Sequence, residues 1–187
     1  VKPQKNSETW FLPLLLFVGL ATLSRIALSF IPNVMPVTIM AVMVGSKFGA
    51  QRAVSFAILV TLASNAVLGH GWWSLFQMIG WGSVAAVASL MSVHDSSGNL
   101  SMNRLLFSSL WSVPIFSIIV SFSILDSSMS MIEFGLYVAN GLLYDVLHFL
   151  GNVFFAMWFG QWFERLLSMN EPHNRLVQQE DEHVSTF

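Results

Sequence analysis

The stretch from Trp10 to Ile31 has the sequence WFLPLLLFVGLATLSRIALSFI and contains a single charged residue, Arg25. A helix that crosses the hydrocarbon core of a bilayer needs about 20 apolar residues, so this stretch is long enough to span it. The same criterion predicts about six apolar segments in the whole chain. The other five are Val34–Gly45, Ala50–Leu68, Ser74–Val93, Arg104–Leu125 and Gly141–Leu167. We therefore predict an all-α integral membrane bundle of six helices.

Composition supports this fold class. Of the 187 residues, 55% are hydrophobic and 10% are charged, whereas a soluble domain has about 25% charged residues. A globular core of this length cannot hide so much apolar surface. The chain contains no cysteine, which excludes disulfides, thiolate catalysis and Cys-ligated metals. A net charge of -2 does not indicate a nucleic-acid partner.

Two segments depart from the simple pattern. Val34–Gly45 is too short to span a bilayer alone, and such a segment is tolerated only if neighbouring helices bury its backbone. The Met-rich stretch Met129–Asn140 is predicted to be a short helix lying over the outer face. We expect one membrane domain over residues 10–167. It lies between a cytoplasmic N-terminus at 1–9 and a polar, acidic, disordered cytoplasmic tail at 168–187.

The positions of Lys and Arg predict the orientation. With six spans, every Lys and Arg except Arg25 falls at a loop or terminus on one side of the membrane. These residues are Lys2, Lys5, Lys47, Arg52, Arg104, Arg165 and Arg175. Cytoplasmic loops carry an excess of Lys and Arg. The pattern predicts a multi-pass protein of the cell membrane with both termini in the cytoplasm.

Polar residues within the apolar segments are candidates for function. Arg25 lies in the outer third of the first helix, where an unpaired Arg costs about 3 kcal/mol. Asp145, His148 and Asn152 are spaced three and four apart, so they share one face of the last helix. Asp145 is expected near the depth of Arg25, and we predict a structural ion pair between them. The same residues can also line a cavity, and the two interpretations are compatible.

A second group lies where the third helix ends and the fourth begins. Aromatic walls with a few convergent polar groups are typical of a small-molecule pocket. The alternative is that the tryptophans are lipid anchors at the membrane interface. The predicted substrate-binding residues are Asn33, Asn65, His70, Trp72, Trp73, Gln77, Trp81, His148 and Asn152.

Motifs of catalysis are missing from the sequence. There is no Gly-x-Ser-x-Gly elbow and no His-Glu-x-x-His, and Gly45–Lys47 lacks the spacing of a P-loop. We therefore predict neither an enzyme, nor a metal site, nor a bound cofactor; a partner must hydrolyse ATP if transport needs it. The alternatives are an intramembrane enzyme using His148 and Asp145, and a small channel or structural membrane subunit.

Several short motifs occur in a recognisable order. Arg25–Ala27 is followed by Pro32–Pro36, by Gly69-x-Gly71-x-Trp73 with Gln77–Gly82, and by Tyr144–Asn152 in the last helix. This order resembles the substrate-binding S components of energy-coupling factor (ECF) transporters, a group of ABC transporters. The last motif is similar to a subgroup linked to cobalamin and other bulky ring-containing substrates. The resemblance extends to about Leu167.

The resemblance implies a fold and a task. S components are six-helix proteins of the prokaryotic plasma membrane that capture a vitamin or related micronutrient near the outer face. The similarity to the cobalamin-linked subgroup makes cobalamin the leading expectation for the substrate. They dock on a transmembrane coupling subunit that two ATPase subunits drive. Many carry an Ala-x-x-x-Ala docking motif in the first helix. Here Ala21 is followed at that spacing by Arg25, so the expected docking surface differs from the usual one.

Overall fold

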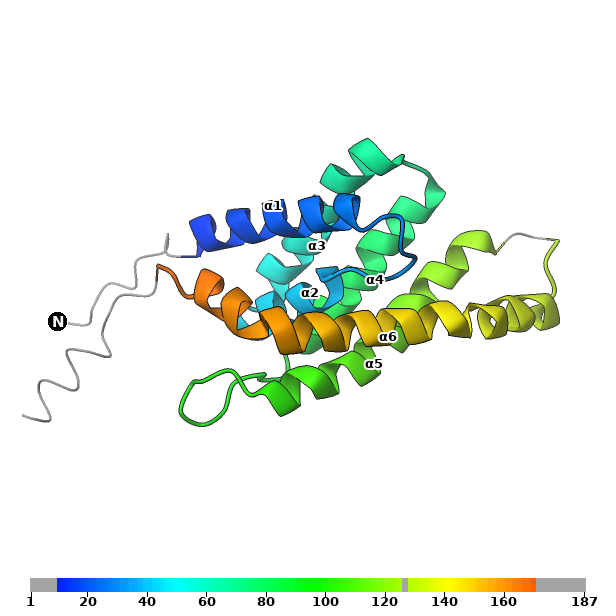
Figure 1. Ribbon diagram of the computed structural model, residues 1–187. Coiled ribbons are helices and arrows are strands. Elements are labelled where there is room, and N and C mark those ends of the chain that lie inside the picture. Colours follow the sequence, from blue (N-terminus) through cyan, green and yellow to red (C-terminus); the bar gives the residue numbers. More distant parts are fainter. Residues whose placement is uncertain (1–9, 126–127, 171–187) are drawn as a thin grey trace, which may run out of the picture.

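The computed structural model describes residues 10–125 and 128–170, and this part of the chain consists of helices joined by turns and loops, with no β-strand (Figure 1). It contains six α-helices and one short 3-10 helix. These are α1 (Phe11–Ala27), α2 (Val37–Phe48), α3 (Ala50–Leu68), α4 (Trp72–Ala88), α5 (Met102–Ser121), η1 (Phe122–Ile124) and α6 (Met131–Leu167). The prediction of an all-α chain with six helices is confirmed for these residues.

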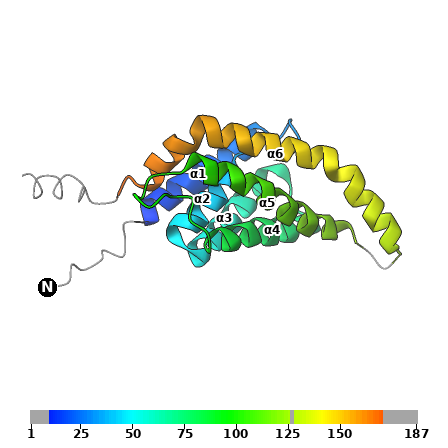
Figure 2. The same ribbon diagram turned by 90° about the horizontal axis from the view of Figure 1, so that it is seen from below.

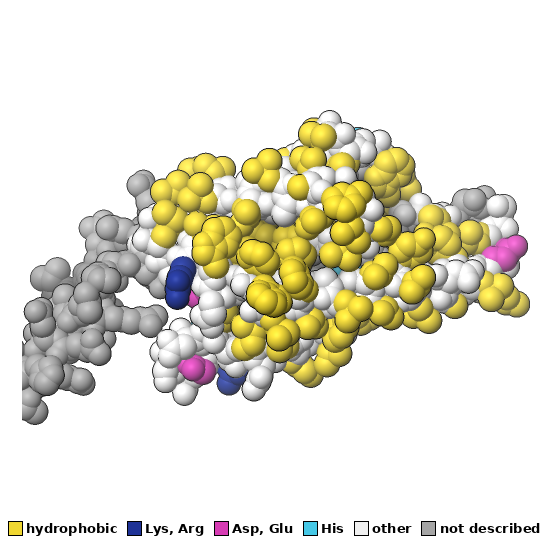
Figure 3. All heavy atoms as spheres, viewed as in Figure 1, with side chains coloured by type: hydrophobic (Ala, Val, Ile, Leu, Met, Phe, Trp, Pro, Cys, Tyr) yellow, Lys and Arg dark blue, Asp and Glu magenta, His cyan; other side chains and the backbone are white. Residues whose placement is uncertain are grey.

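Three stretches are long and apolar enough to cross a membrane, namely α3, α5 together with η1, and α6. Helices α1 and α2 are apolar but shorter. Figure 3 shows apolar side chains over much of the face in view, above all in its middle, as a lipid-facing surface requires. These observations agree with a membrane protein. Six spans and cytoplasmic termini stay predictions.

Helix α2 is the centre of the bundle. Residues Val37–Gly45 are all buried, and α2 contacts each of the other five α-helices. Those five form a ring around it, in the order α1, α3, α4, α5, α6 and back to α1. A Cβ atom at Gly45 would overlap the main-chain oxygen of Ala85, so glycine permits the close approach of α2 to α4. The prediction that neighbouring helices must bury this short segment is confirmed.

Helix α6 is much longer than the sequence predicted. A capping box starts it at Ser130, whose Oγ accepts from the Glu133 backbone N–H at 3.3 Å while the Glu133 carboxylate accepts from the Ser130 N–H at 2.8 Å. The helix then continues for 37 residues. A separate short helix over the outer face at Met129–Asn140 is therefore wrong. From Met131 onward this stretch forms the first turns of α6, which extend beyond the other helices (Figure 2).

The two ends of the bundle differ in charge. Lys47 pairs with Glu164, and the Arg52 guanidinium lies 4.6 Å from the ring centroid of Trp10. These residues and Arg104 lie near the start of α1 and the end of α6. We call this the basic end. We call the opposite end, where the α1–α2 turn lies, the cavity end, because a cavity opens there. The predicted segments 1–9 and most of 168–187 lie outside the described residues, as do Lys2, Lys5 and Arg175.

Candidate ligand-binding site

A cavity of about 420 Å³ opens at the cavity end of the bundle. The α1–α2 turn, the end of α5 and the first half of α6 form its walls. The lining residues are Pro32, Asn33, Phe116, Ser117, Val120, Ser121, Tyr137, Asn140, Gly141, Tyr144 and Asp145. Its volume falls within the range of roughly 300–1,000 Å³ that is usual for small-molecule sites. The lining includes three aromatic rings and two asparagine amides.

Asn33 positions the α1–α2 turn over this cavity. It adopts a left-handed backbone conformation with φ of 59°, which Asn tolerates better than most residues. Its Nδ2 donates to the carbonyl oxygen of Tyr144 at 3.3 Å, which fastens the turn to α6. Of the nine predicted binding residues, all within the described part of the chain, Asn33 alone lines the cavity.

The predicted ion pair between Arg25 and Asp145 is not formed. Arg25 is 5% exposed, and its guanidinium donates to Ser64 Oγ through Nη1 and to Gln77 Oε1 through Nη2 at 3.0 Å. It also lies over the ring of Trp81, 4.9 Å from the centroid. The reason is that the two side chains point in different directions around the bundle. The Arg25 side chain points to Ser64 of α3 and reaches Gln77 of α4, while Asp145 on α6 is half-buried and lines the cavity.

The amides of Asn65 and Gln77 bind each other inside the bundle. Asn65 Nδ2 donates to Gln77 Oε1 at 2.9 Å and to Ser74 Oγ at 2.8 Å. Ser74 Oγ in turn accepts from the Gly71 backbone N–H at 3.3 Å. With Arg25, these contacts join α1, α3 and α4 through buried polar side chains. The two amides predicted to bind substrate therefore hold the helices together at the cavity end.

Trp81 and His148 lie behind the cavity wall rather than in it. The Trp81 ring stacks on Phe116 with centroids 4.6 Å apart, and the His148 ring meets Phe116 edge-on at 5.3 Å. Trp81 Nε1 donates to Thr38 Oγ1 at 3.0 Å, and Thr38 Oγ1 lies 2.7 Å from His148 Nε2. Sequence reasoning missed Phe116 and Thr38. In the sequence, the neighbours of these two residues do not distinguish them from the other residues of an apolar helix.

The remaining residues of the predicted site at the α3–α4 turn point outward. Trp72 is 65% exposed and Trp73 is 48% exposed, and His70 is exposed as well. Trp72 meets Phe76 edge-on, and the Trp73 ring covers Gly71. None of them lines the cavity. Their exposure favours the lipid-anchor interpretation over the pocket interpretation.

Asn152 belongs to a group of buried polar atoms that have no hydrogen-bond partner in the described part of the chain. Both of its amide atoms are unpaired, as are His148 Nδ1, Ser109 Oγ and Ser112 Oγ. All four residues are at most 3% exposed. Each buried unpaired group costs about 1–3 kcal/mol, so this group needs a partner that compensates for the loss.

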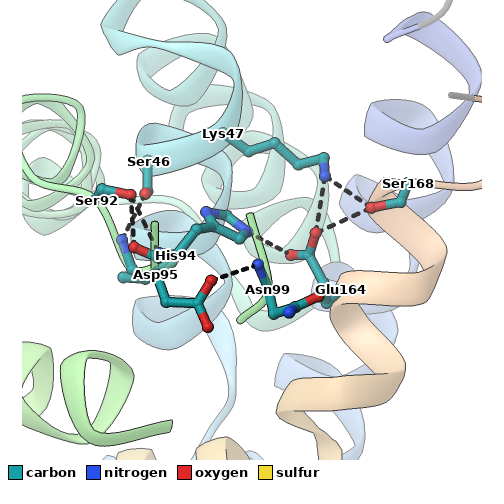
Figure 4. A network of polar contacts seen from close by, with 9 residues as sticks. Ser46, Lys47, Ser92, His94, Asp95, Asn99, Glu164 and Ser168 are labelled. Carbon is teal, nitrogen blue, oxygen red and sulfur yellow. Dashed lines mark hydrogen bonds and ion pairs between the residues drawn. The ribbon is translucent and has the colours of Figure 1, made fainter. Parts of the chain in front are cut away.

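A second polar network lies at the basic end (Figure 4). The Glu164 carboxylate accepts from Lys47 Nζ at 2.8 Å and from Ser168 Oγ at 2.9 Å, and lies 3.1 Å from His94 Nε2. Ser46 Oγ accepts from the Val93 backbone N–H at 2.9 Å. These contacts fasten the end of α6 and the α4–α5 loop to α2. Among the described residues, no group of His, Asp and Glu side chains is arranged to hold a metal ion.

Comparison with protein-family models, curated proteins and solved structures gives no match. The cavity, its walls and the charge difference between the two ends are therefore the observations from which a function is proposed.

Proposed function

We propose that this chain is the membrane-embedded substrate-binding subunit of an ATP-driven importer of the ECF type, and that it captures a micronutrient. The observation that carries the proposal is the 420 Å³ cavity at the end of the bundle opposite the basic residues. Clefts and cavities lined by apolar and aromatic side chains with a few polar groups are the usual form of small-molecule sites.

The proposed orientation makes this cavity face the outside. Lys47, Arg52 and Arg104 gather at one end, and an excess of Lys and Arg marks the cytoplasmic side of a membrane protein. With six spans and both termini in the cytoplasm, the cavity end is extracellular. The first turns of α6 then form an outer wall that a ligand meets before it enters the bundle.

The walls favour a flat, ring-containing ligand. Phe116, Tyr137 and Tyr144 line the cavity, and aromatic rings can stack on a flat ligand. Asn33 and Asn140 offer amides that both donate and accept hydrogen bonds. The cavity volume lies in the lower half of the usual range. A corrinoid would place only part of itself there, so the volume favours a smaller vitamin over cobalamin.

The rival functions have less support. For an enzyme, His148 and Asp145 would act as acid and base, but His148 is buried behind Phe116 with its Nε2 against Thr38. For a channel, a pore would run along the axis that the buried helix α2 occupies. A binding subunit requires neither an exposed base nor a pore. ATP hydrolysis and the coupling movement are then the tasks of a transmembrane coupling subunit and two ATPases.

Mass spectrometry of small molecules released from the detergent-purified protein tests the proposal. We expect one micronutrient-sized compound in an amount close to that of the protein. A sample unfolded before the final wash serves as the control and should have lost the compound. A protein that carries no compound and that binds none from a panel of ring-containing vitamins would not be a substrate-binding subunit.

A further inference from the structure

We propose, building on the function proposed above, that the cavity continues past Phe116 into an inner subsite made of His148, Asn152, Ser109 and Ser112, and that this subsite recognises a neutral lactam- or amide-type edge of the ligand. A lactam edge presents an N–H donor beside a C=O acceptor. The placement, burial and chemistry of these four side chains carry the proposal.

The register of α5 against α6 places the four side chains together. The two helices are antiparallel, and two contacts fix their register. The Phe116 ring meets His148 at 5.3 Å, and a Cβ atom at Gly160 would lie 3.0 Å from the Leu105 side chain. Counting inward from these contacts places Ser112 level with Asn152. Ser109, one turn further along α5, follows on the same face.

The subsite is fully buried and its polar atoms are unpaired. Asn152 is 0% exposed, and neither its Oδ1 nor its Nδ2 has a partner in the part of the chain that the structure describes. His148 Nδ1 and the two serine hydroxyls share this condition. Folded proteins rarely leave buried polar groups unpaired. A bound group that supplies the missing donors and acceptors would therefore bind with a favourable free energy.

The hydrogen bonds around Thr38 indicate what the subsite offers. Thr38 Oγ1 accepts from Trp81 Nε1, so its own hydroxyl hydrogen is available to donate to His148 Nε2. In that arrangement the ring proton of the neutral imidazole is on Nδ1, which becomes a donor. Asn152 contributes a donor and an acceptor side by side. Because the four side chains are then all neutral, they suit a neutral group better than a carboxylate or an ammonium.

Phe116 separates the open cavity from this subsite. Its ring lines the cavity and also contacts both Trp81 and His148. A Cβ atom at Gly80 would lie 2.9 Å from the Phe116 ring, so the glycine provides the space in which the ring lies. A rotation of this side chain would join the cavity and the four polar residues, with a flat ring of the ligand taking its place against Trp81.

A matched pair of probes tests the inner subsite, namely 2-quinolinone, a flat bicyclic lactam, and its N-methyl derivative, which lacks the N–H. Ligand-observed NMR titration of the full chain in detergent gives both affinities. We expect a preference of about tenfold for 2-quinolinone, which corresponds to about 1.4 kcal/mol. Asn152→Leu should reduce the preference to within about twofold. Asn103→Leu, the same change at an exposed position of α5, should leave it intact.

Ser112→Ala is the second variant, so that a folding defect in Asn152→Leu does not decide the test. It should also reduce the preference. Equal binding of the two probes to the wild-type protein, no binding of either, or a preference that survives both variants would each overturn the inner subsite. None of these outcomes changes what is expected from mass spectrometry of the co-purifying compound. Failure of the subsite and failure of the proposed function are therefore distinguishable.

Discussion

The contact between Arg25 and Gln77 predicts an asymmetry between two substitutions. Gln77→Leu removes an acceptor 3.0 Å from the Arg25 guanidinium, which leaves a buried N–H of a charged group without a partner. Arg25→Met leaves neither of the two side chains to which Arg25 donated without a hydrogen bond. Ser64 Oγ still donates to the Val60 carbonyl at 2.6 Å, and Gln77 Oε1 still accepts from Asn65 at 2.9 Å. Gln77→Leu should therefore destabilise the protein more.

The expected magnitudes follow from these contacts. A hydrogen bond from a charged donor contributes about 1.5–3 kcal/mol, so we expect Gln77→Leu to lower the free energy of unfolding by about 2–3 kcal/mol. Arg25→Met loses the cation–π contact with Trp81, worth about 0.5–2 kcal/mol, but also removes a buried charge. Its cost should be about 1 kcal/mol. The double variant should resemble Arg25→Met, with a coupling energy of about 2–3 kcal/mol.

Thermal unfolding of the single and double variants in one detergent measures these differences. For a chain of this size about 2–4 °C of Tm corresponds to 1 kcal/mol, so Gln77→Leu should lower Tm by roughly 4–12 °C. Asp145→Asn is the control, because Asp145 does not contact Arg25, and its effect should add to that of Arg25→Met. A larger loss in Arg25→Met than in Gln77→Leu would refute the reasoning. A coupling energy between Arg25 and Asp145 would instead support the ion pair that was predicted from the sequence.

Three further predictions concern packing, topology and the basic end. Gly45→Ala should lower Tm markedly, because its Cβ would overlap a main-chain oxygen of α4, whereas Gly19→Ala, with open space around the new Cβ, should not; thermal unfolding compares the two. Single-cysteine variants at the exposed positions Ser96 and His70 should differ in whole cells, because an impermeant thiol reagent should label only the cysteine that replaces His70. Labelling confined to the cysteine that replaces Ser96 would show that the orientation is opposite to the predicted one. Glu164→Gln should weaken the contacts that join α6 to α2 and to the α4–α5 loop. It should lower Tm by a few degrees, which corresponds to a loss of roughly 1–2 kcal/mol in the free energy of unfolding. An unchanged Tm would show that this network does not contribute to stability.

The sequence predicted the helices well where apolar length and turn residues agree. The predicted bounds of Ala50–Leu68 coincide with those of α3, since Gly49 precedes the first residue and Gly69 follows the last. The need to bury α2 also followed from its length alone. The start of α6 was missed because Glu133 and Asn140 break the apolar run. A capping box and continuous helical propensity, rather than hydropathy, determine where that helix begins.

The site was predicted less well, because depth in a membrane does not fix direction around a bundle. Arg25 and Asp145 were paired on depth, yet the side chain of Arg25 is turned toward α3 and α4. The amides of Asn65 and Gln77 were expected in a pocket, and they bind each other instead. Asn33 lies in the short α1–α2 turn and lines the cavity, and its role in binding stays a prediction. Phe116 has no local signal, since its role depends on which helices meet there.

The central claim is that the cavity at the end opposite the basic residues captures a small molecule. Gly141 lines this cavity and has open space around its Cβ position, so Gly141→Trp should fill the cavity without a clash in the backbone. Gly135→Trp is the matched control, at an exposed position of the same helix that lies outside the cavity lining.

Isothermal titration of the compound that co-purifies with the wild-type protein, performed on both variants, measures the claim directly. We predict that Gly141→Trp weakens binding by about 100-fold or more, which is about 2.7 kcal/mol or above, while Gly135→Trp binds like the wild type. Equal affinity in the wild type and in Gly141→Trp, with the variant folded, would contradict the account.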